Sequence, residues 1–308
     1  MDFLRDHQLR QGNDLEKEGW TILKLIRWTS ERFQREGLTT PRLDAEVLLS
    51  SALGVDRIRL YTHFDQPLLP EELARFREMI QRRLKREPVA YIVGRREFWS
   101  LSFKVTRDVL IPRPETEILV SEALALCPFI PLGNGDLKVL EIGTGSGAIS
   151  VALSKELAAG LITATDVSEK ALAVAEENAA SNGVRERLRF LRGDLFSPLK
   201  NGEQFHLILT NPPYISREEW SGLMPEVRDF EPFLALDGGR DGVDFYRRAL
   251  LQVSEFLFPG GWFLGEIGAG QDRKILEIAG QNPALGEFSF VPDLSGIKRV
   301  FKARKRKE

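Results

Sequence analysis

The sequence predicts an α/β protein in which a mainly parallel sheet, with helices on both faces, follows a small helical bundle. Residues 20–87 place apolar side chains three to four positions apart and contain no β-rich run. Beyond about residue 105, short apolar segments alternate with longer helical patterns, as they do in βαβ units. The length of 308 residues also suits roughly two domains.

The N-terminal part contains three predicted helices. The first covers residues 20–36 and ends at Gly37. The second begins at Thr40 and Pro41, because threonine suits an N-cap and proline suits the first helical position. The third covers residues 70–86. The bundle contains no catalytic constellation of its own, so its plainest interpretation is a stabilising cap.

Residues 88–112 form a predicted β-hairpin linker, which leads into a helix that starts near Pro114. Predicted strands then cover residues 138–142, 161–165, 188–192, 206–210, 262–266, 288–291 and 298–302. Helices are predicted from about residue 147 and over residues 168–182. The last two strands are close enough in the sequence to pair antiparallel. Ligands of the parallel part should bind at the carboxyl ends of its strands.

Composition and charge exclude several classes of protein. An apolar share of 43% and a charged share of 29% are typical of globular chains, and no apolar run approaches the ~18 residues of a membrane helix. Five acidic residues among the first 18 exclude a secretion signal and a transit peptide. The single cysteine, Cys127, suits the core and, with three histidines, leaves no ligand set for a metal. The net charge of −2 argues against a protein whose main task is to bind nucleic acid.

A glycine-rich loop, "EIGTGSGA", follows the first predicted strand of the sheet and opens the next helix. Gly143, Gly145 and Gly147 would let the backbone approach a ligand closely at a helix N-terminus. Read with Ala148 as the last small position, the loop also fits the pattern of dinucleotide-binding proteins. Asp166, at the end of the next strand, would accept hydrogen bonds from ribose hydroxyls with either ligand.

Two further acidic residues favour S-adenosylmethionine over a dinucleotide. Glu141 precedes the first glycine, where its negative charge suits a cationic ligand and would repel a pyrophosphate. Asp194 follows the third strand of the sheet, where a carboxylate can accept a hydrogen bond from an adenine amino group. The alternative interpretation of these acids is a helix-capping or solvated carboxylate.

The stretch "ILTNPPYI" ends another predicted strand abruptly at Asn211, Pro212 and Pro213. Proline has no backbone N–H, and a residue before proline is extended, so this loop presents mostly hydrogen-bond acceptors. The side-chain carbonyl of Asn211 and the backbone carbonyl of Pro212 can converge on an NH₂ group, and Tyr214 offers a flat wall to a planar amide or base. Holding both hydrogens aims the nitrogen lone pair at a sulfonium methyl group. A double-proline strand terminator is the plainer interpretation, which the upstream glycine loop disfavours.

Together these motifs resemble the class I methyltransferases that modify amino groups through an Asn-Pro-Pro-Tyr motif, and among them the release-factor glutamine methyltransferases. The matching stretches cover nearly everything after about residue 20: "RLDAEVLL" (42–49), "PVAYIVGRREFW" (88–99), "LIPRPETE" (110–117), "LEIGTGSGAIS" (140–150), "TNPPYI" (210–215), "EPFLALDGGRDGVDFYR" (231–247) and "DLSGIKRVF" (293–301). Asn-Pro-Pro-Tyr is shared with DNA and RNA amino-methyltransferases. The stretch "PRPETE" and the helical N-terminal domain point to the glutamine enzymes.

The resemblance implies a Rossmann-like sheet with one antiparallel strand, in a methyltransferase domain over residues 113–308. An N-terminal extension (1–19), a helical substrate-recognition domain (20–87) and the hairpin linker (88–112) precede it. The implied S-adenosylmethionine site, to which the charge argument adds Glu141, comprises Gly143, Thr144, Gly145, Ser146, Gly147, Asp166, Asp194, Leu195 and Asn211. The implied catalytic and glutamine-binding residues are Asn211, Pro212, Pro213 and Tyr214. Leu195 departs from the aromatic residues also found there, and would pack on adenine without stacking.

The leading hypothesis is an enzyme that methylates the side-chain amide nitrogen of glutamine in the Gly-Gly-Gln motif of class 1 peptide-chain release factors. The reaction would modulate translation termination, and S-adenosylmethionine would leave as S-adenosylhomocysteine. The alternative is a DNA or RNA amino-group (adenine N6) methyltransferase, which would flip a base into the same pocket; only the shared motif and the basic tail (302–307) favour it. A module that binds the cofactor without turnover is disfavoured by the intact Asn211 and Tyr214. We expect a cytoplasmic monomer with no membrane association and no stable nucleic-acid binding.

Overall fold

The computed structural model describes residues 19–130, 132, 135–157 and 160–307. Apart from Gly19, the predicted N-terminal extension therefore lies outside the described residues. The chain divides into two compact units, Met1–Val93 and Gly94–Glu308. Each unit has hydrophobic core residues of its own.

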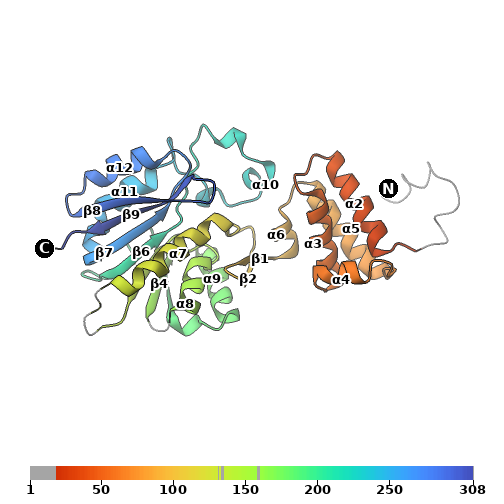
Figure 1. The fold of residues 1–308 in the computed structure, drawn as a ribbon, viewed down its shortest axis with the longest axis horizontal. Coiled ribbons are helices and arrows are strands. Elements are labelled where there is room, and N and C mark those ends of the chain that lie inside the picture. Colours follow the sequence, from red (N-terminus) through yellow and green to blue (C-terminus); the bar gives the residue numbers. More distant parts are fainter. Residues whose placement is uncertain (1–18, 131, 133–134, 158–159, 308) are drawn as a thin grey trace. The chain divides into compact units, whose positions relative to one another are not determined.

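The N-terminal unit is a helical bundle (Figure 1). Its helices are α2 (Ile22–Arg35), α3 (Pro41–Leu53), α4 (Arg57–Thr62), α5 (Pro70–Leu84) and α6 (Val89–Val93). Thr21 caps α2, because its hydroxyl oxygen accepts the backbone N–H of Lys24 at 3.4 Å. Thr40 is the N-cap residue of α3, but its hydroxyl donates to Asp44 at 2.7 Å instead of accepting from the helix N–H groups. Asp44 also pairs with the buried Arg83 at 2.8 Å, which ties α3 to α5.

The core of the bundle follows the helical periodicity of its sequence. Phe33, Leu48, Leu49, Phe76 and Ile80 are almost completely buried. They lie on α2, α3 and α5, and within a helix they recur at spacings that place them on one face. Burying these large apolar side chains is the main source of stability for so small a unit.

A two-stranded antiparallel hairpin opens the C-terminal unit, within the predicted linker 88–112; residues 89–93 of that range instead form helix α6. Strand β1 (Arg95–Phe98) pairs with β2 (Leu101–Lys104). Trp99 and Ser100 form the turn with φ of 52° and 55°. Positive φ at both turn residues is the geometry of the two-residue hairpin turn that matches the twist of the strands.

The main sheet has seven strands in the order β5-β4-β3-β6-β7-β9-β8. The strands are β3 (Lys138–Ile142), β4 (Leu161–Asp166), β5 (Leu188–Arg192), β6 (Phe205–Thr210), β7 (Leu257–Glu266), β8 (Leu285–Pro292) and β9 (Lys298–Lys305). The first five strands in this order are parallel, and β9 runs antiparallel between β7 and β8. The predicted fold class, a mainly parallel sheet with one antiparallel strand, is confirmed. The strand order changes direction between β3 and β6, which is where ligands bind in open α/β sheets.

Helices cover both faces of this sheet (Figure 1). They are α7 (Glu117–Leu126), α8 (Ala148–Glu156), α9 (Glu169–Ser181), α11 (Asp244–Phe256) and α12 (Asp272–Gly280). The unit also contains the short helix α10 (Pro225–Arg228) and the 3₁₀ turns η1 (Pro114–Thr116), η2 (Cys127–Phe129), η3 (Arg185–Arg187), η4 (Trp220–Gly222) and η5 (Phe233–Ala235). Val139 and Leu207 pack with α7, α8 and α9, whereas their neighbours Leu140 and Ile208 pack with α11 and α12. Cys127, predicted in the core, is only partly buried. Among the described residues, no helix has the length and apolar character needed to cross a membrane.

Candidate active site

The carboxyl ends of the central strands meet at one edge of the sheet. Ile142, the last residue of β3, lies beside Thr165 of β4 on one side and Thr210 of β6 on the other. The glycine loop, Asp166 and the Asn-Pro-Pro-Tyr segment come directly after these residues. The structure therefore brings the predicted cofactor-binding and substrate-binding segments together at this edge.

The glycine loop has the backbone conformation that its sequence requires. Gly143, Gly145 and Gly147 have φ of 73°, 54° and 80°, values that only glycine adopts without strain. A Cβ atom on Gly143 or Gly145 would meet no described heavy atom within 4 Å. A Cβ atom on Gly147 would lie 3.1 Å from the Cβ of Ala175 in α9. The first two glycines thus border open space that a ligand can fill, and the third lets α8 and α9 pack closely.

Glu141 lies buried beneath the loop. Its Oε2 atom accepts hydrogen bonds from the Thr144 hydroxyl at 2.8 Å, from the Ser150 backbone N–H at 3.1 Å and from the Ser150 hydroxyl. Burial raises the pKa of Glu141 to about 7, although the hydrogen bonds from Ser150 and Thr144 act in the opposite direction. The carboxyl group therefore fastens the loop to α8, and near pH 7 it carries only part of a negative charge.

Asp166 connects the glycine loop to the start of α9. Its Oδ2 accepts the backbone N–H of Gly145 at 2.9 Å, and its Oδ1 accepts the backbone N–H of Ser168 at 2.9 Å. Burial raises its pKa, against the effect of these backbone bonds. Each carboxylate oxygen can accept a second hydrogen bond, so Asp166 retains capacity for two ligand hydroxyls. Ser146 lies at the other side of the loop, and its carbonyl accepts Nδ2 of Asn178 at 2.8 Å.

Asp194 and Leu195 follow β5 at the same edge of the sheet. Asp194 is exposed and forms an ion pair with Arg248 of α11. Leu195 has φ of 49°, which is unusual for a residue with a branched side chain, and its side chain is buried. It packs with the core cluster that contains Phe196. The Leu195 side chain is therefore part of the core, and only a small part of it is exposed next to Asp194.

Asn211 lies directly beyond β6, and its two side-chain atoms have different surroundings. The Nδ2 atom donates to the Thr116 hydroxyl at 3.0 Å, and that hydroxyl donates to Oε2 of Glu266 at 2.6 Å. The Oδ1 atom is buried and has no hydrogen-bond partner among the described residues. Leaving a buried acceptor unpaired costs about 1–3 kcal/mol. This oxygen is therefore suited to receive an N–H group from a ligand.

Glu266, the last residue of β7, is a buried acid at the site. Its Oε1 accepts the hydroxyl of Tyr214 at 3.4 Å. Burial raises the pKa of Glu266 to about 7; the Thr116 and Tyr214 hydroxyls lower it, the charge of Glu115 raises it, and Arg299 lowers it. Burial and the negative charge of Glu266 also raise the pKa of the Tyr214 hydroxyl well above its usual range. Tyr214 therefore stays a neutral donor to this carboxyl group.

The Asn-Pro-Pro-Tyr segment is held by the loop that precedes α11. Pro212 is buried and Pro213 is half-buried. Ile215 exchanges backbone hydrogen bonds with residues 236–238: its N–H donates to the Leu236 carbonyl, and its carbonyl accepts the Gly238 N–H, both at 2.9 Å. A Cβ atom on Gly238 would lie 2.8 Å from the backbone of Tyr214, so glycine is required for this contact.

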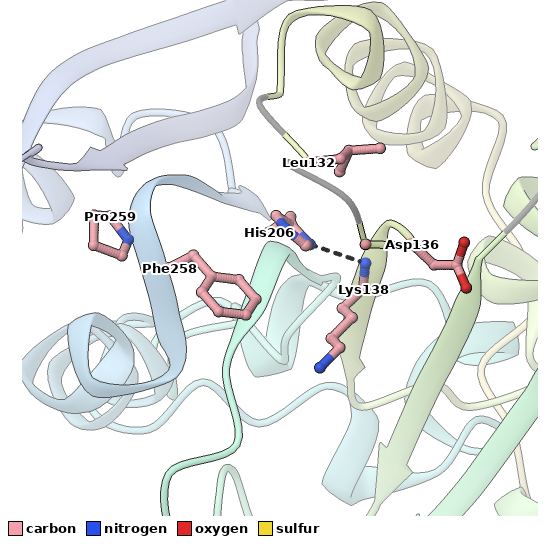
Figure 2. Close-up of a pocket in the computed structure, with 7 residues that line it drawn as sticks. Leu132, Asp136, Lys138, His206, Phe258 and Pro259 are labelled. Carbon is pink, nitrogen blue, oxygen red and sulfur yellow. Dashed lines mark hydrogen bonds between the residues drawn. The ribbon is translucent and has the colours of Figure 1, made fainter.

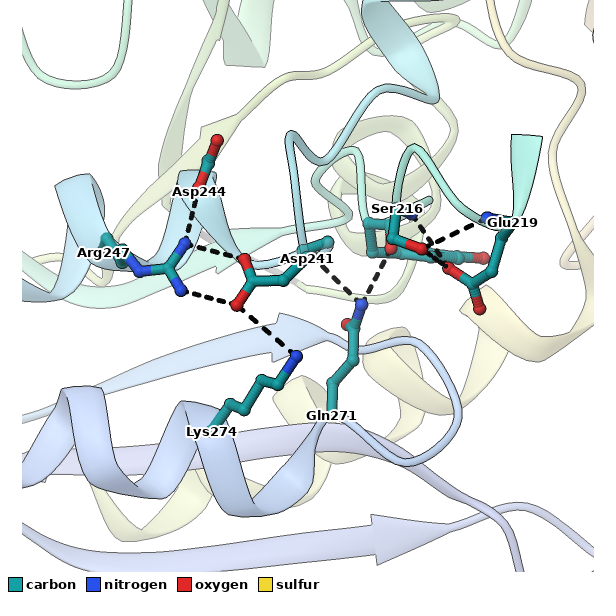
Figure 3. A network of polar contacts seen from close by, with 9 residues as sticks. Ser216, Glu219, Asp241, Asp244, Arg247, Gln271 and Lys274 are labelled. Carbon is teal, nitrogen blue, oxygen red and sulfur yellow. Dashed lines mark hydrogen bonds and ion pairs between the residues drawn. The ribbon is translucent and has the colours of Figure 1, made fainter.

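Charged side chains hold the other end of this loop (Figure 3). Arg247 of α11 pairs with Asp241 at 2.6 Å and with Asp244 at 2.5 Å, and Lys274 of α12 lies 3.4 Å from Asp241. The Arg247 guanidinium keeps the pKa of the Asp241 carboxyl well below its usual range. In the same view, Gln271 points at the backbone of the loop. The loop is thus anchored from two helices.

A cavity of about 370 Å³ lies elsewhere on the sheet (Figure 2). It is lined by Lys138, the first residue of β3, by His206 near the start of β6, and by Phe258. The backbone N–H of Lys138 donates to Nδ1 of His206 at 3.0 Å. These residues mark the amino ends of the strands, so this cavity is separate from the edge that carries the glycine loop.

Three residues of the site have no place in the sequence-based prediction. Thr116 lies within the quoted stretch "PRPETE", which was the available signal for it. Glu266 ends a predicted strand, and acidic residues at that position are informative only once the strand order is known. Gln271 follows β7 in a segment with no distinctive motif. Among the described residues, no cluster of histidine, cysteine and acidic side chains could hold a metal ion.

Comparison with known proteins places the chain among named relatives. Residues 24–94 match the family model "PrmC N-terminal domain", and residues 125–224 match the model "Methyltransferase small domain". The chain is 45% identical over 287 residues to a "Release factor glutamine methyltransferase" of Geobacter sulfurreducens. The aligned region covers 93% of this chain and 98% of that protein. The chain is 41% identical over 289 residues to a protein of the same description from Rhodopirellula baltica, covering 93% and 97%.

Solved structures share the fold at lower sequence identity. The hMettl16 catalytic domain, in complex with the MAT2A 3′UTR hairpin 6, superposes with a TM-score of 0.52 and 15% identity. The match covers 73% of this chain and 81% of that one. Together with the strand order, this similarity supports the Rossmann-like class I methyltransferase fold that the sequence predicts.

Proposed function

This chain belongs to the release factor glutamine methyltransferases, and from that premise we propose that it methylates the glutamine of the Gly-Gly-Gln motif in class 1 release factors. The methyl group comes from S-adenosylmethionine and is transferred to the side-chain amide nitrogen. The relatives carry this description over nearly their whole length, which supports the assignment more strongly than the shared Asn-Pro-Pro-Tyr motif does.

The residues around the glycine loop fit S-adenosylmethionine. The open space beside Gly143 and Gly145 suits the amino-acid part of the ligand, and Asp166 has free acceptor capacity for two ribose hydroxyls. The exposed carboxylate of Asp194 would accept a hydrogen bond from the adenine amino group, and the buried Leu195 next to it would offer only a small apolar surface to the ring. When bound, this cofactor supplies an electrophilic methyl group on a sulfonium and leaves as S-adenosylhomocysteine.

The chain's own part in the reaction is to hold an amide nitrogen. In an amide, the nitrogen lone pair is delocalised into the carbonyl group, so the nitrogen is a weak nucleophile. Acceptors at Asn211 Oδ1 and the Pro212 carbonyl would each bind one N–H of the glutamine and favour a tetrahedral nitrogen. As the new N–C bond formed, the nitrogen would become strongly acidic and would give up one of its two protons to water, so no strong base is required before transfer. Catalysis then consists of positioning and electrostatics.

A single observation carries the proposal: the buried Oδ1 atom of Asn211 has no hydrogen-bond partner among the described residues. A loop that served only to end β6 would have no reason to leave this acceptor unpaired. An N–H from glutamine removes the cost of the unpaired acceptor. The half-buried ring of Tyr214, four residues into the same segment, is suited to cover the planar amide.

The proposal extends to the rest of the chain. The helical unit would recognise the release factor, because the chemistry is already complete in the residues of the C-terminal unit. The protein would act in the cytoplasm, where its substrate takes part in translation termination, as a monomer and without stable nucleic-acid binding. A DNA or RNA amino-group methyltransferase is the competing activity, and the names of the relatives do not favour it.

A direct experiment separates these activities. The full-length protein is incubated with S-adenosylmethionine that carries a labelled methyl group. Separate reactions contain release factor, DNA or ribosomes as the candidate substrate. We expect label only in the release factor, on the glutamine of the Gly-Gly-Gln motif as located by mass spectrometry of its peptides. Label in DNA or ribosomal RNA, with none in release factor, would overturn the proposal in favour of the nucleic-acid activity.

A further inference from the structure

Behind Asn211 lies a short chain of hydrogen bonds that the proposed reaction does not itself use. The Thr116 hydroxyl oxygen accepts Nδ2 of Asn211 at 3.0 Å, and the hydroxyl donates to Glu266 at 2.6 Å. Thr116 is 4% exposed and Glu266 is 2% exposed, so water has little access to these bonds. Thr116 belongs to η1 and Glu266 ends β7, so two separate segments converge behind Asn211.

The polarity of these bonds decides which end of the Asn211 amide faces the site. A hydroxyl group has a single hydrogen, and an ionised carboxylate can only accept. In the structure the Thr116 hydroxyl gives its hydrogen to Oε2 of Glu266, as it must wherever this carboxyl group is ionised, which is the main form above about pH 7. Its oxygen is then left to accept from Nδ2 of Asn211, which turns Oδ1 away from Thr116. If the hydrogen of Thr116 pointed at Asn211 instead, the amide would turn over and would present its own NH₂ to the NH₂ of the substrate.

From this geometry we infer that Thr116 and Glu266 are positioning residues for methyl transfer, which act through Asn211 to keep its acceptor oxygen directed at the substrate amide. The inference rests on the proposed function, because that function gives Oδ1 its purpose. Neither residue contacts the reacting atoms. Their effect is to prevent the amide from rotating into the orientation in which two donors would face one another.

The surroundings of Glu266 agree with this role. Its second oxygen, Oε1, accepts the hydroxyl of Tyr214 at 3.4 Å, so one carboxyl group contacts both the Asn211 support and the Tyr214 ring. The Tyr246 hydroxyl donates to the backbone carbonyl of Glu266, which fixes the end of β7 against α11. The charged groups that act on the carboxyl group are Glu115 and Arg299, one of each sign. Hydrogen bonds from η1 and from the Asn-Pro-Pro-Tyr segment therefore hold the carboxyl group, and α11 holds the backbone of the same residue.

The test is the variant Thr116→Val, which removes the hydroxyl and keeps the shape of the side chain. We expect kcat on release factor, at saturating S-adenosylmethionine, to fall by about 10- to 100-fold, because the acceptor is no longer held in one orientation. The affinity for S-adenosylmethionine, measured by calorimetry, should not change. Thr116→Ser restores a hydroxyl and should return kcat to within about threefold of wild type. Thr163→Val is the matched control, since the Thr163 hydroxyl is also buried and accepts from Arg189 at 2.9 Å.

A second readout does not depend on activity. In nuclear magnetic resonance spectra of protein with isotope-labelled asparagine, the side-chain NH₂ group of Asn211 gives a pair of resonances. This pair is identified by its absence from the spectrum of Asn211→Ala. In Thr116→Val the bond to Thr116 is lost, so one of these resonances should move. In Thr116→Ser the bond is kept, so both resonances should stay in place. If Thr116→Val does not fold, Thr116→Ala removes the same hydroxyl with less bulk.

The outcomes are distinct. A folded Thr116→Val with wild-type kcat, or with unchanged Asn211 resonances, overturns the positioning role and leaves the proposed function intact. A loss of kcat that Thr116→Ser does not restore also overturns it, because the effect is then one of packing. If the wild-type protein does not label release factor, the proposed function fails instead, and the Asn211 resonances alone decide the orientation.

Discussion

The side-chain amide of Gln271 donates a hydrogen bond of 2.8 Å to the backbone carbonyl oxygen of Tyr214 (Figure 3). The same nitrogen donates to the carbonyl of Gly242 at 3.1 Å, and Oε1 of Gln271 accepts the backbone N–H of Gly268 at 2.9 Å. One buried side chain therefore satisfies backbone groups of three different loops. The position of the Asn-Pro-Pro-Tyr segment depends on this residue as well as on the loop before α11.

The variant Gln271→Ala should lower the free energy of unfolding by about 2–3 kcal/mol, because it leaves several buried backbone groups without partners. Denaturation with urea measures this change. Gln281→Ala is the control, since Gln281 is exposed at the other end of α12. It should alter the free energy of unfolding by less than about 0.5 kcal/mol. Equal stability of the two variants would show that the three backbone groups do not need Gln271.

The sequence was sufficient to predict the central strands and the two loops of the site, because apolar runs that end at glycine or proline are local signals. Helix α11 has no such boundary. Its apolar residues Tyr246, Ala249, Leu250 and Val253 recur at helical spacing, but β7 follows at Leu257 with no turn residue between them. The end of one element and the start of the next therefore look like one apolar stretch.

The contacts that support the site were beyond local analysis for a different reason. Thr116 and Glu266 are 150 residues apart in the sequence, and Tyr214 and Gln271 are 57 apart. Their hydrogen bonds exist only because β6 and β7 are neighbours in the sheet, so that the ends of these strands and η1 converge. A pattern in one segment carries no information about which polar residue of another segment will face it.

The buried acid Glu266 should make stability depend on pH. An unfolded glutamate releases its proton near pH 4.5, whereas Glu266 in the folded protein keeps its proton until about pH 7. Between these values the folded state binds more protons, so the free energy of unfolding should fall as the pH rises. The contribution of this one group is about 3 kcal/mol at most. Glu115 and Arg299, which act on it with opposite signs, partly offset one another.

The variant Glu266→Gln isolates this contribution. Its free energy of unfolding, measured at intervals from pH 5 to pH 8, should fall less than that of the wild type over the same range. Part of the fall should remain, because burial also raises the pKa of Glu141 to about 7. Glu255→Gln, at an exposed position of α11, is the control and should keep the full wild-type pH dependence. A parallel pH dependence in Glu266→Gln would exclude Glu266 as its source.

Substitution of Asn211 separates an oriented acceptor from a strand terminator. Asn211→Ala keeps both prolines but removes Oδ1. Loss of such a group from a preorganised site lowers kcat by a factor of about 10² to 10³. Asn211→Asp keeps an acceptor oxygen, but it replaces the NH₂ donor to the Thr116 hydroxyl with a second oxygen and adds a charge. Because the acceptor oxygen is kept, we expect Asp to retain more activity than Ala, with both variants folded by circular dichroism. Turnover of Asn211→Ala within about threefold of wild type would reduce the motif to a strand terminator.

Asp166 should contribute to cofactor affinity. Asp166→Ala removes the charged acceptor for the ribose hydroxyls and also releases the backbone N–H groups of Gly145 and Ser168. The binding free energy of S-adenosylmethionine should become less favourable by roughly 1.5–3 kcal/mol, which is typical of losing hydrogen bonds to a charged group. Calorimetry gives the dissociation constant directly. Glu169→Ala, an exposed acid at the start of α9 that pairs with Arg192, should bind as the wild type does.

If the helical unit recognises the release factor as proposed, its exposed apolar residues should make part of that contact. Ile58 is 73% exposed and Phe64 is 51% exposed, on and directly after α4. We expect the double variant Ile58→Glu, Phe64→Glu to raise KM for intact release factor by at least about tenfold, because charges replace apolar contact area. The kcat value should stay unchanged, since the proposed catalytic residues all belong to the C-terminal unit.

Two comparisons make this last prediction specific. A short peptide that contains Gly-Gly-Gln lacks the rest of the release factor that would contact α4, so wild type and double variant should methylate it with the same kcat/KM. Leu251→Glu, at a position of α11 that is 58% exposed, adds a comparable charge to the C-terminal unit and should leave KM for the release factor unchanged. If the double variant methylated intact release factor with wild-type KM, the surface around α4 would have no part in recognition. If it lost activity on the peptide as well, the substitutions would have damaged the fold and not the docking surface.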